Sequence, residues 1–175
     1  MLLFTALLPP EHVVVALRGE LDRLGAWGSD DVRWSPPHQW HITLAFYGEH
    51  HDSASLAELL ADRLRGSEAP RVWLEGAGTF PGVLLLRVGG EGLTELADDA
   101  GAGQGGREYR PHLTLGRMAR EARTPWEQRL AEYRTEPWTA REVVLMRSDR
   151  TEGGPHYRVV GTYQLTCGRH SSSAG

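Results

Sequence analysis

The chain has 175 residues, of which 40% are hydrophobic and 24% charged, and its formal net charge is -4. This length and apolar content fit one globular domain with a buried core and exclude a long disordered protein. The net negative charge argues against a protein that coats nucleic acid through bulk charge, but it permits a local grip on one phosphate. Lysine is absent, so any side-chain cation that holds a phosphate here is Arg or protonated His.

The cysteine content indicates a reducing compartment, and the apolar runs argue against a membrane-spanning segment. Cys167 is the single cysteine, which excludes an intrachain disulfide and a cysteine-based zinc site. The first ten residues lack the basic segment of a signal peptide, and the apolar runs, such as 83–86, are too short to span a membrane. We therefore expect a cytoplasmic monomer with no membrane partner.

Strand and helix patterns follow one another irregularly along the chain. The predicted strands are at residues 2–8, 32–34, 40–47, 71–74, 83–88, 112–117, 142–147 and 157–166. The predicted helices follow Pro10 and Ser53 and occupy residues 93–100 and 124–133, the last opening on a Thr-Pro-Trp-Glu capping sequence. Because strands and helices do not alternate regularly, the sequence predicts an α+β fold.

The glycine-rich segments predict turns and loops. Residues 76–82 predict a turn between two strands, and residues 100–106 predict a mobile loop, either a lid or an inert connection. The Ser/Gly/Ala-rich residues 168–175 predict a disordered tail, which leaves residues 1–167 as a single domain.

One four-residue pattern occurs twice, as His41-Ile42-Thr43-Leu44 and as His112-Leu113-Thr114-Leu115. In a strand, residues i and i+2 point to the same face. Each His therefore projects together with the Thr two residues later, while Ile42, Leu44 and Phe46 face the core. Two such strands side by side would place two imidazoles and two hydroxyls in one cleft.

This group of side chains suits phosphate chemistry near neutral pH. One neutral imidazole accepts a proton while its charged partner donates one. The hydroxyls of Thr43 and Thr114 donate to phosphoryl oxygens, and Arg117, five residues after His112, binds a phosphate with two hydrogen bonds. The alternatives are a pair of structural histidines and a solvated arginine at a strand end.

Three aromatic residues near the motifs have two interpretations each. Tyr47 lies on the predicted strand face of His41 and so lines the cleft, and Tyr109 and Trp40 stack on a base. Packing in the core is the alternative for each of them.

A metal site is a further interpretation of the histidines at 38, 41, 50 and 51. Two prolines disfavour a helix at this point, and the chain has neither paired cysteines nor an H-E-x-x-H motif. We therefore predict no metal and no cofactor.

The two H-x-T-L motifs and their flanks resemble the 2H phosphoesterase superfamily. Within it, the chain is most similar to the RNA 2′,3′-cyclic phosphodiesterases, also called the 2′-5′ RNA ligase family. Besides the motifs, the similar segments are residues 33–37, 41–49, 76–81, 109–117, 142–148 and 153–157, so the resemblance extends over about residues 2–166.

The resemblance implies a two-lobed α+β fold with an antiparallel sheet in each lobe, helices outside and the active site in the cleft between the lobes. It implies metal-independent hydrolysis of RNA 2′,3′-cyclic phosphate ends to 2′-phosphomonoesters, and, in reverse, 2′-5′ ligation. His41 corresponds to the proton donor and His112 to the base, while Thr43, Thr114 and Arg117 hold the phosphoryl oxygens. The alternatives are a phosphodiesterase for a small cyclic nucleotide or an ADP-ribose cyclic phosphate, and a non-catalytic module that binds RNA ends.

Overall fold

The computed structural model describes residues 1–49, 52–104 and 106–168. The strands are β1 (Leu2–Leu7), β2 (Arg33–Trp34), β3 (Ile42–Glu49), β4 (Arg71–Phe80), β5 (Val83–Glu91), β6 (His112–Arg117), β7 (Trp138–Thr139), β8 (Glu142–Thr151) and β9 (Gly154–Gln164). The helices are α1 (Glu11–Arg23), α2 (Ser53–Arg63), α3 (Leu93–Asp99) and α4 (Trp126–Arg129), with short 3-10 turns η1 (Ala26–Gly28) and η2 (Pro37–Gln39). None of the described helices is long and apolar enough to cross a membrane.

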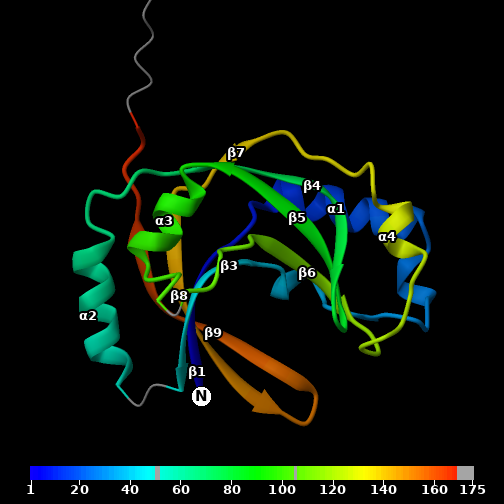
Figure 1. The fold of residues 1–175 in the computed structure, drawn as a ribbon, viewed down its shortest axis with the longest axis horizontal. Helices are drawn as coiled ribbons and strands as arrows, with labels where there is room; N and C mark the ends of the chain where they lie inside the picture. Colours follow the sequence, from blue (N-terminus) through cyan, green and yellow to red (C-terminus); the bar gives the residue numbers. More distant parts are fainter. Residues whose placement is uncertain (50–51, 105, 169–175) are drawn as a thin grey trace, which may run out of the picture.

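The described strands form one curved antiparallel sheet, ordered β7-β4-β5-β6-β3-β1-β8-β9, with β2 added beside β6 (Figure 1). Between β3 and β6 the register holds at one described residue pair, Ile42 with Leu113. The mixed strand and helix content confirms the α+β class. The two sheets expected for the two lobes are halves of one sheet, joined at this narrow seam.

The helices pack on one face of the sheet and leave the other face largely open. Apolar residues of α1, α2 and α3 belong to the main core, together with one face of the strands. The opposite face carries a small cluster, Phe4, Ala6, Val144 and Met146, with Tyr157 packed against it. The open face therefore has room for a cleft.

The turn predicted at residues 76–82 is in large part strand, because β4 continues to Phe80. A β-bulge shifts the β4–β5 register between Leu74 and Ala77. Gly76 has a φ of 85° there, and a Cβ on it would lie 2.6 Å from the carbonyl oxygen of Ala131. Gly76 therefore marks a bulge with a close backbone approach, and the turn itself is limited to Pro81 and Gly82.

The helix predicted over residues 124–133 is also shorter, since α4 ends at Arg129. The carbonyl of Leu130 accepts hydrogen bonds from the backbone N–H groups of Ala77 and Tyr133, at 3.2 and 3.1 Å. This pairing with the β4 bulge draws the chain out of helical geometry. Tertiary hydrogen bonding here overrides the local capping signal.

The predicted loop and tail are described only in part. In the loop, Ala100 is buried and the backbone N–H of Ala102 donates to the carbonyl of Ala97 at 2.8 Å. Gly105 and residues 169–175 lie outside the described residues, so the predictions of a mobile loop and a disordered tail stay predictions.

Candidate active site

A cleft of about 1250 Å³ lies on the open face of the sheet, where the two half-sheets meet. Its lining includes side chains from both halves and from the far end of the β8–β9 hairpin. Five of the residues predicted for the site line it together: His41, Thr43, His112, Thr114 and Arg117. The cleft thus joins two motifs that are 71 residues apart in the sequence.

A β-bulge at Leu44 determines which side chains of the first motif reach the cleft. On β1, Thr5 pairs with Ala45 and Ala6 pairs with Thr43, so Leu44 is the extra residue on β3. A bulge of one residue inverts the alternation of side chains beyond it.

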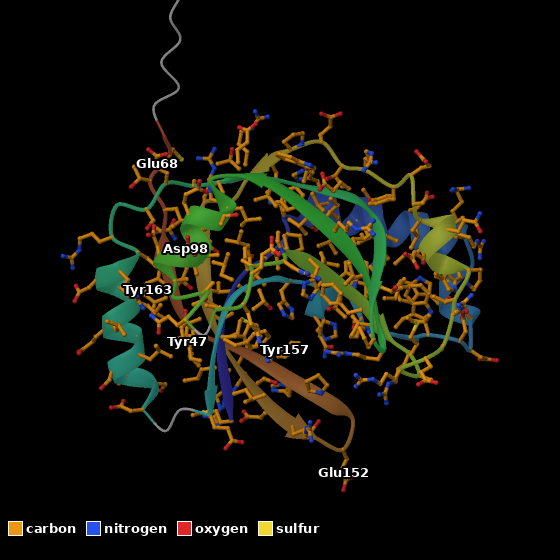
Figure 2. The ribbon with its side chains drawn as sticks, viewed as in Figure 1. Tyr47, Glu68, Asp98, Glu152, Tyr157 and Tyr163 are labelled. Atoms are coloured by element: carbon orange, nitrogen blue, oxygen red, sulfur yellow. The ribbon has the colours of Figure 1, made fainter. Side chains whose placement is uncertain are left out.

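The inverted alternation corrects two predictions. Phe46 was expected in the core, but it is 71% exposed and lines the cleft. Tyr47 was expected in the cleft, but it lies on the core face, and Figure 2 shows it on the side of α2. Its hydroxyl donates to the carbonyl of Ala100 at 2.6 Å and accepts from the hydroxyl of Thr5 at 2.9 Å. Burial raises the pKa of Tyr47 to about 12.

The second motif has a bulge at the same place. On β5, Leu84 pairs with Gly116 and Leu85 with Thr114, so Leu115 is the extra residue on β6. Without the bulge, Arg117 would point away from His112, because the two are an odd number of residues apart. With it, Arg117 lies on the cleft face. The motif's last Leu therefore brings the fifth residue after each histidine, Phe46 or Arg117, to the cleft.

Tyr109 and Trp40 do not line the cleft either. The Tyr109 hydroxyl donates to the carbonyl of Thr43 at 2.7 Å, and burial raises the pKa of Tyr109. Trp40 is 3% exposed and belongs to the core. Tyr109 thus fixes the backbone of the first motif from behind, and the predicted stacking of these rings on a base is corrected to packing.

Both histidines are held in the same way. Nδ1 of His41 lies 2.7 Å from the carbonyl oxygen of Gln39, and Nδ1 of His112 lies 2.8 Å from that of Arg110. A carbonyl oxygen only accepts, so each Nδ1 carries a proton and donates it. Each Nε2 is therefore the nitrogen left to exchange protons with a substrate.

Aromatic rings restrict the orientation of both imidazoles. The His41 ring lies 5.1 Å from Phe4 and 5.4 Å from Tyr157, and the His112 ring lies 4.9 Å from Phe80. Figure 2 shows Tyr157 at the base of the β8–β9 hairpin. None of these three rings could be assigned a role from the sequence, because their contacts depend on strand pairing between distant segments.

The electrostatics of the cleft differ between the two histidines. Burial lowers the pKa of His41, and the charge of His112 lowers it further, while the hydrogen bond to Gln39 opposes this shift. Arg117 is exposed and has no ion pair among the described side chains. Burial raises the pKa of Tyr157, and the charge of Arg117 opposes this rise, so the guanidinium acts on a ring across the cleft.

Among the described residues, no group of three or more His, Cys, Asp or Glu side chains gathers where it could hold a metal ion. His38 is exposed on η2, and the His50 and His51 of the metal hypothesis lie outside the described residues.

Comparison with known proteins places this architecture in one group. The model of the 2′-5′ RNA ligase superfamily matches residues 9–152. An RNA 2′,3′-cyclic phosphodiesterase of Thermus thermophilus is 32% identical over 194 residues, which cover 94% of this chain and 90% of the relative.

Two solved structures extend the comparison to the fold. A protein of Thermus thermophilus superposes with a TM-score of 0.77 at 28% identity, covering 94% of this chain and 98% of the other. Escherichia coli LigT complexed with 3′-AMP superposes with a TM-score of 0.71 at 25% identity, with the same coverage. The fold is thus that of the 2H phosphoesterases. Within this class, the chain belongs to the 2′-5′ RNA ligase superfamily.

Proposed function

We propose that the protein hydrolyses the 2′,3′-cyclic phosphate end of RNA to a 2′-phosphomonoester. The observation that carries the proposal is the matched pair of histidines, each held through Nδ1 by a backbone carbonyl and each lining the same cleft. The relatives named RNA 2′,3′-cyclic phosphodiesterase support the same reaction.

The reaction uses one histidine as a base and the other as an acid. Nε2 of His112 accepts a proton from a water molecule, whose oxygen attacks the phosphorus. The bond from phosphorus to the ribose 3′ oxygen breaks, and Nε2 of His41 donates a proton to that oxygen. Thr43, Thr114 and Arg117 hold the non-bridging oxygens, where negative charge gathers in the transition state.

Because the pKa of His41 is lowered, its protonation depends on substrate binding. In the free protein, burial favours the neutral imidazole. An anionic phosphate in the cleft favours the charged form, so His41 gains its proton when the substrate binds. The protonated His41 then lies beside the leaving oxygen. Once the phosphate departs, burial again disfavours the charged imidazole.

The proposed reaction needs no metal ion, because the two histidines supply both proton transfers and Arg117 supplies the positive charge. Run in reverse, the same groups would join a cyclic end to a 5′-hydroxyl and form a 2′-5′ linkage. We further propose that the protein acts in the cytoplasm as a monomer.

The size of the cleft favours an RNA end over a small cyclic phosphate. Sites for small molecules measure roughly 300–1000 Å³, and this cleft measures about 1250 Å³. The complex of Escherichia coli LigT with 3′-AMP shows that the fold admits a nucleotide monophosphate in that protein. The remaining volume here suits further nucleotides.

The test is incubation of an RNA that bears a 2′,3′-cyclic end with the protein in EDTA, followed by identification of the phosphorylated hydroxyl. The proposal predicts a 2′-phosphate. A 3′-phosphate, or turnover only after a divalent metal is added, would contradict it. Tight binding without any product would favour a module that recognises RNA ends.

A further inference from the structure

Two arginines face each other across neighbouring strands at one end of the cleft. Arg33 on β2 pairs directly with Arg117 on β6, and both side chains line the cleft. Like charges directly opposite in an antiparallel pair are destabilising. Neither guanidinium forms an ion pair with an acidic side chain in the part of the chain that the structure describes. This arrangement favours the binding of anions by the two guanidinium groups in the cleft.

Backbone pairing and close packing against β6 hold β2 in this position. The backbone N–H of Ser35 donates to the carbonyl of Leu115 at 2.8 Å. A Cβ at Gly116 would lie 2.5 Å from Cγ1 of Val32 and 2.8 Å from the carbonyl oxygen of Arg33, so the close approach of β2 requires glycine there. Arg33 is thus brought beside the cleft by specific packing.

The residue next to Arg33, Trp34, anchors the strand through its ring and also borders the cleft. Trp34 makes edge-to-face contacts with Trp126 at 5.1 Å and with Trp27 at 5.9 Å. The indole Nε1 of Trp126 in turn donates to the hydroxyl of Ser29 at 3.1 Å. Directly paired residues of neighbouring strands point to the same face, so Arg33 shares the cleft face of its partner Arg117. The backbone of Arg33 is therefore ordered before any ligand arrives.

The two arginines have different positions relative to the reacting phosphate. Arg117 belongs to the motif strand, and its charge reaches Tyr157, which packs on His41. Arg117 is therefore placed for the cyclic phosphate between the histidines. Arg33 lies opposite Arg117 at the end of β6, away from the point where Ile42 pairs with Leu113 between the two histidine strands.

We propose that Arg33 binds the phosphodiester next to the cyclic end, and so selects oligonucleotide ends over cyclic mononucleotides. A cyclic mononucleotide has no such phosphate and gains nothing from this residue. The inference rests on the proposed function, because it assumes that the cyclic phosphate occupies the cleft between His41 and His112.

The test compares a 2′,3′-cyclic mononucleotide with a dinucleotide that carries the same cyclic end. The measured quantity is the ratio of kcat/KM for the dinucleotide to that for the mononucleotide. A hydrogen bond between charged groups contributes enough that Arg33→Gln should lower this ratio by about tenfold. It should also reduce the salt dependence of dinucleotide binding, by about 0.7 in the slope of log K against log salt.

Three further variants separate this role from general effects. Arg33→Lys keeps the charge and should restore part of the ratio, which a purely structural role of Arg33 would not predict. Arg117→Gln should lower kcat/KM for both substrates and leave the ratio nearly as it was. Arg18→Gln, on an exposed face of α1 away from the cleft, is the matched control and should change neither rate. An unchanged ratio in Arg33→Gln would overturn the inference.

Binding of the products tests the inference independently of turnover. The dissociation constants of a dinucleotide and a mononucleotide, each ending in a 2′-phosphate, are measured by calorimetry for the wild type and Arg33→Gln. We expect the variant to lose affinity for the dinucleotide by about tenfold more than for the mononucleotide. Equal losses would contradict the role of Arg33, whereas a wild type that hydrolyses neither substrate would contradict the proposed function.

Discussion

The two motif strands, β3 and β6, share a backbone design. Each carries a His, a Thr two residues later and a bulge at the following Leu, and each His donates from Nδ1 to the carbonyl two residues earlier. The surroundings differ. His41 lies between two aromatic rings with a lowered pKa, and its fifth following residue is Phe46. His112 contacts one described ring, Phe80, and its fifth following residue is Arg117.

In the proposed mechanism, this difference gives one backbone design two chemical roles. In both halves, a backbone carbonyl holds Nδ1 and so orients Nε2, and a bulge turns the fifth residue after the histidine toward the cleft. Burial lowers the pKa of His41. The residue two positions after each bulge, Phe46 or Arg117, makes one part of the cleft apolar and another cationic. The predictions below test first what the halves share and then what distinguishes them.

Removing either histidine should have the largest effect. His41→Ala and His112→Ala should each lower kcat on a 2′,3′-cyclic RNA end by at least about a hundredfold, because each removes one proton transfer. His12→Ala, which alters an exposed histidine on α1, is the matched control and should retain full activity. Near-normal turnover in either motif variant would mean that its half does not take part in the chemistry.

Removing the charge of Arg117, two residues after the second bulge, should have the next largest effect on activity. Arg117→Gln should lower kcat/KM by about tenfold to a hundredfold, since a hydrogen bond from a charged group to the phosphate is lost. Arg110→Gln is a suitable control, because Arg110 precedes the same strand but is not among the residues that line the cleft. Equal losses of kcat/KM in the two variants would show that Arg117 does not bind the phosphate.

Substitution of Phe46, two residues after the first bulge, should have a smaller effect that is confined to binding. Phe46 is 71% exposed in the cleft, so Phe46→Ala should leave the unfolding temperature nearly unchanged. If the ring stacks on a nucleobase, as exposed aromatic rings do in single-strand binding, KM should rise by about tenfold. Phe46→Tyr keeps the ring and should behave as the wild type. An unchanged KM in the alanine variant would exclude this stacking.

The smallest effect concerns the titration of His41. Its pKa should lie below the usual 6.5, so the ring stays neutral until the pH falls further than for an exposed His. Tyr157→Ala admits water beside the ring and should raise this pKa in an NMR titration. Tyr163→Ala, on the same strand but packed toward α2, should leave it unchanged. A His41 pKa at or above 6.5 in the wild type would contradict the burial argument.

The lowered pKa of His41 also has a consequence for stability. As the pH falls, the unfolded chain binds a proton at His41 near pH 6.5, whereas the folded protein binds it only at a lower pH. Protonation therefore favours unfolding, and this stability is lost as the pH falls from about 6.5 through the lower pKa of the folded His41. Denaturant unfolding at a series of pH values should show this loss, and the loss should be smaller in Tyr157→Ala.

The sequence predicted the part of the site that depends on period two within a strand. His41 with Thr43, and His112 with Thr114, share a face because no bulge separates them. Phe46 and Tyr47 were assigned to the wrong faces, since the bulge at Leu44 arises from pairing with β1 and leaves no local signal. Gly76 has the same explanation, because its bulge depends on a distant carbonyl. Bulges and ring contacts are properties of the paired sheet and cannot be derived from one strand.

The most direct test of the central claim, that the two halves act on one phosphate, is a double-variant comparison. The turnover of His41→Ala, His112→Ala and the double variant is measured on the same 2′,3′-cyclic RNA end in EDTA. If the two histidines work as a unit, the double variant should be no more than a few-fold slower than the slower single variant. Losses that multiply in the double variant would show that the histidines act independently and would contradict the account.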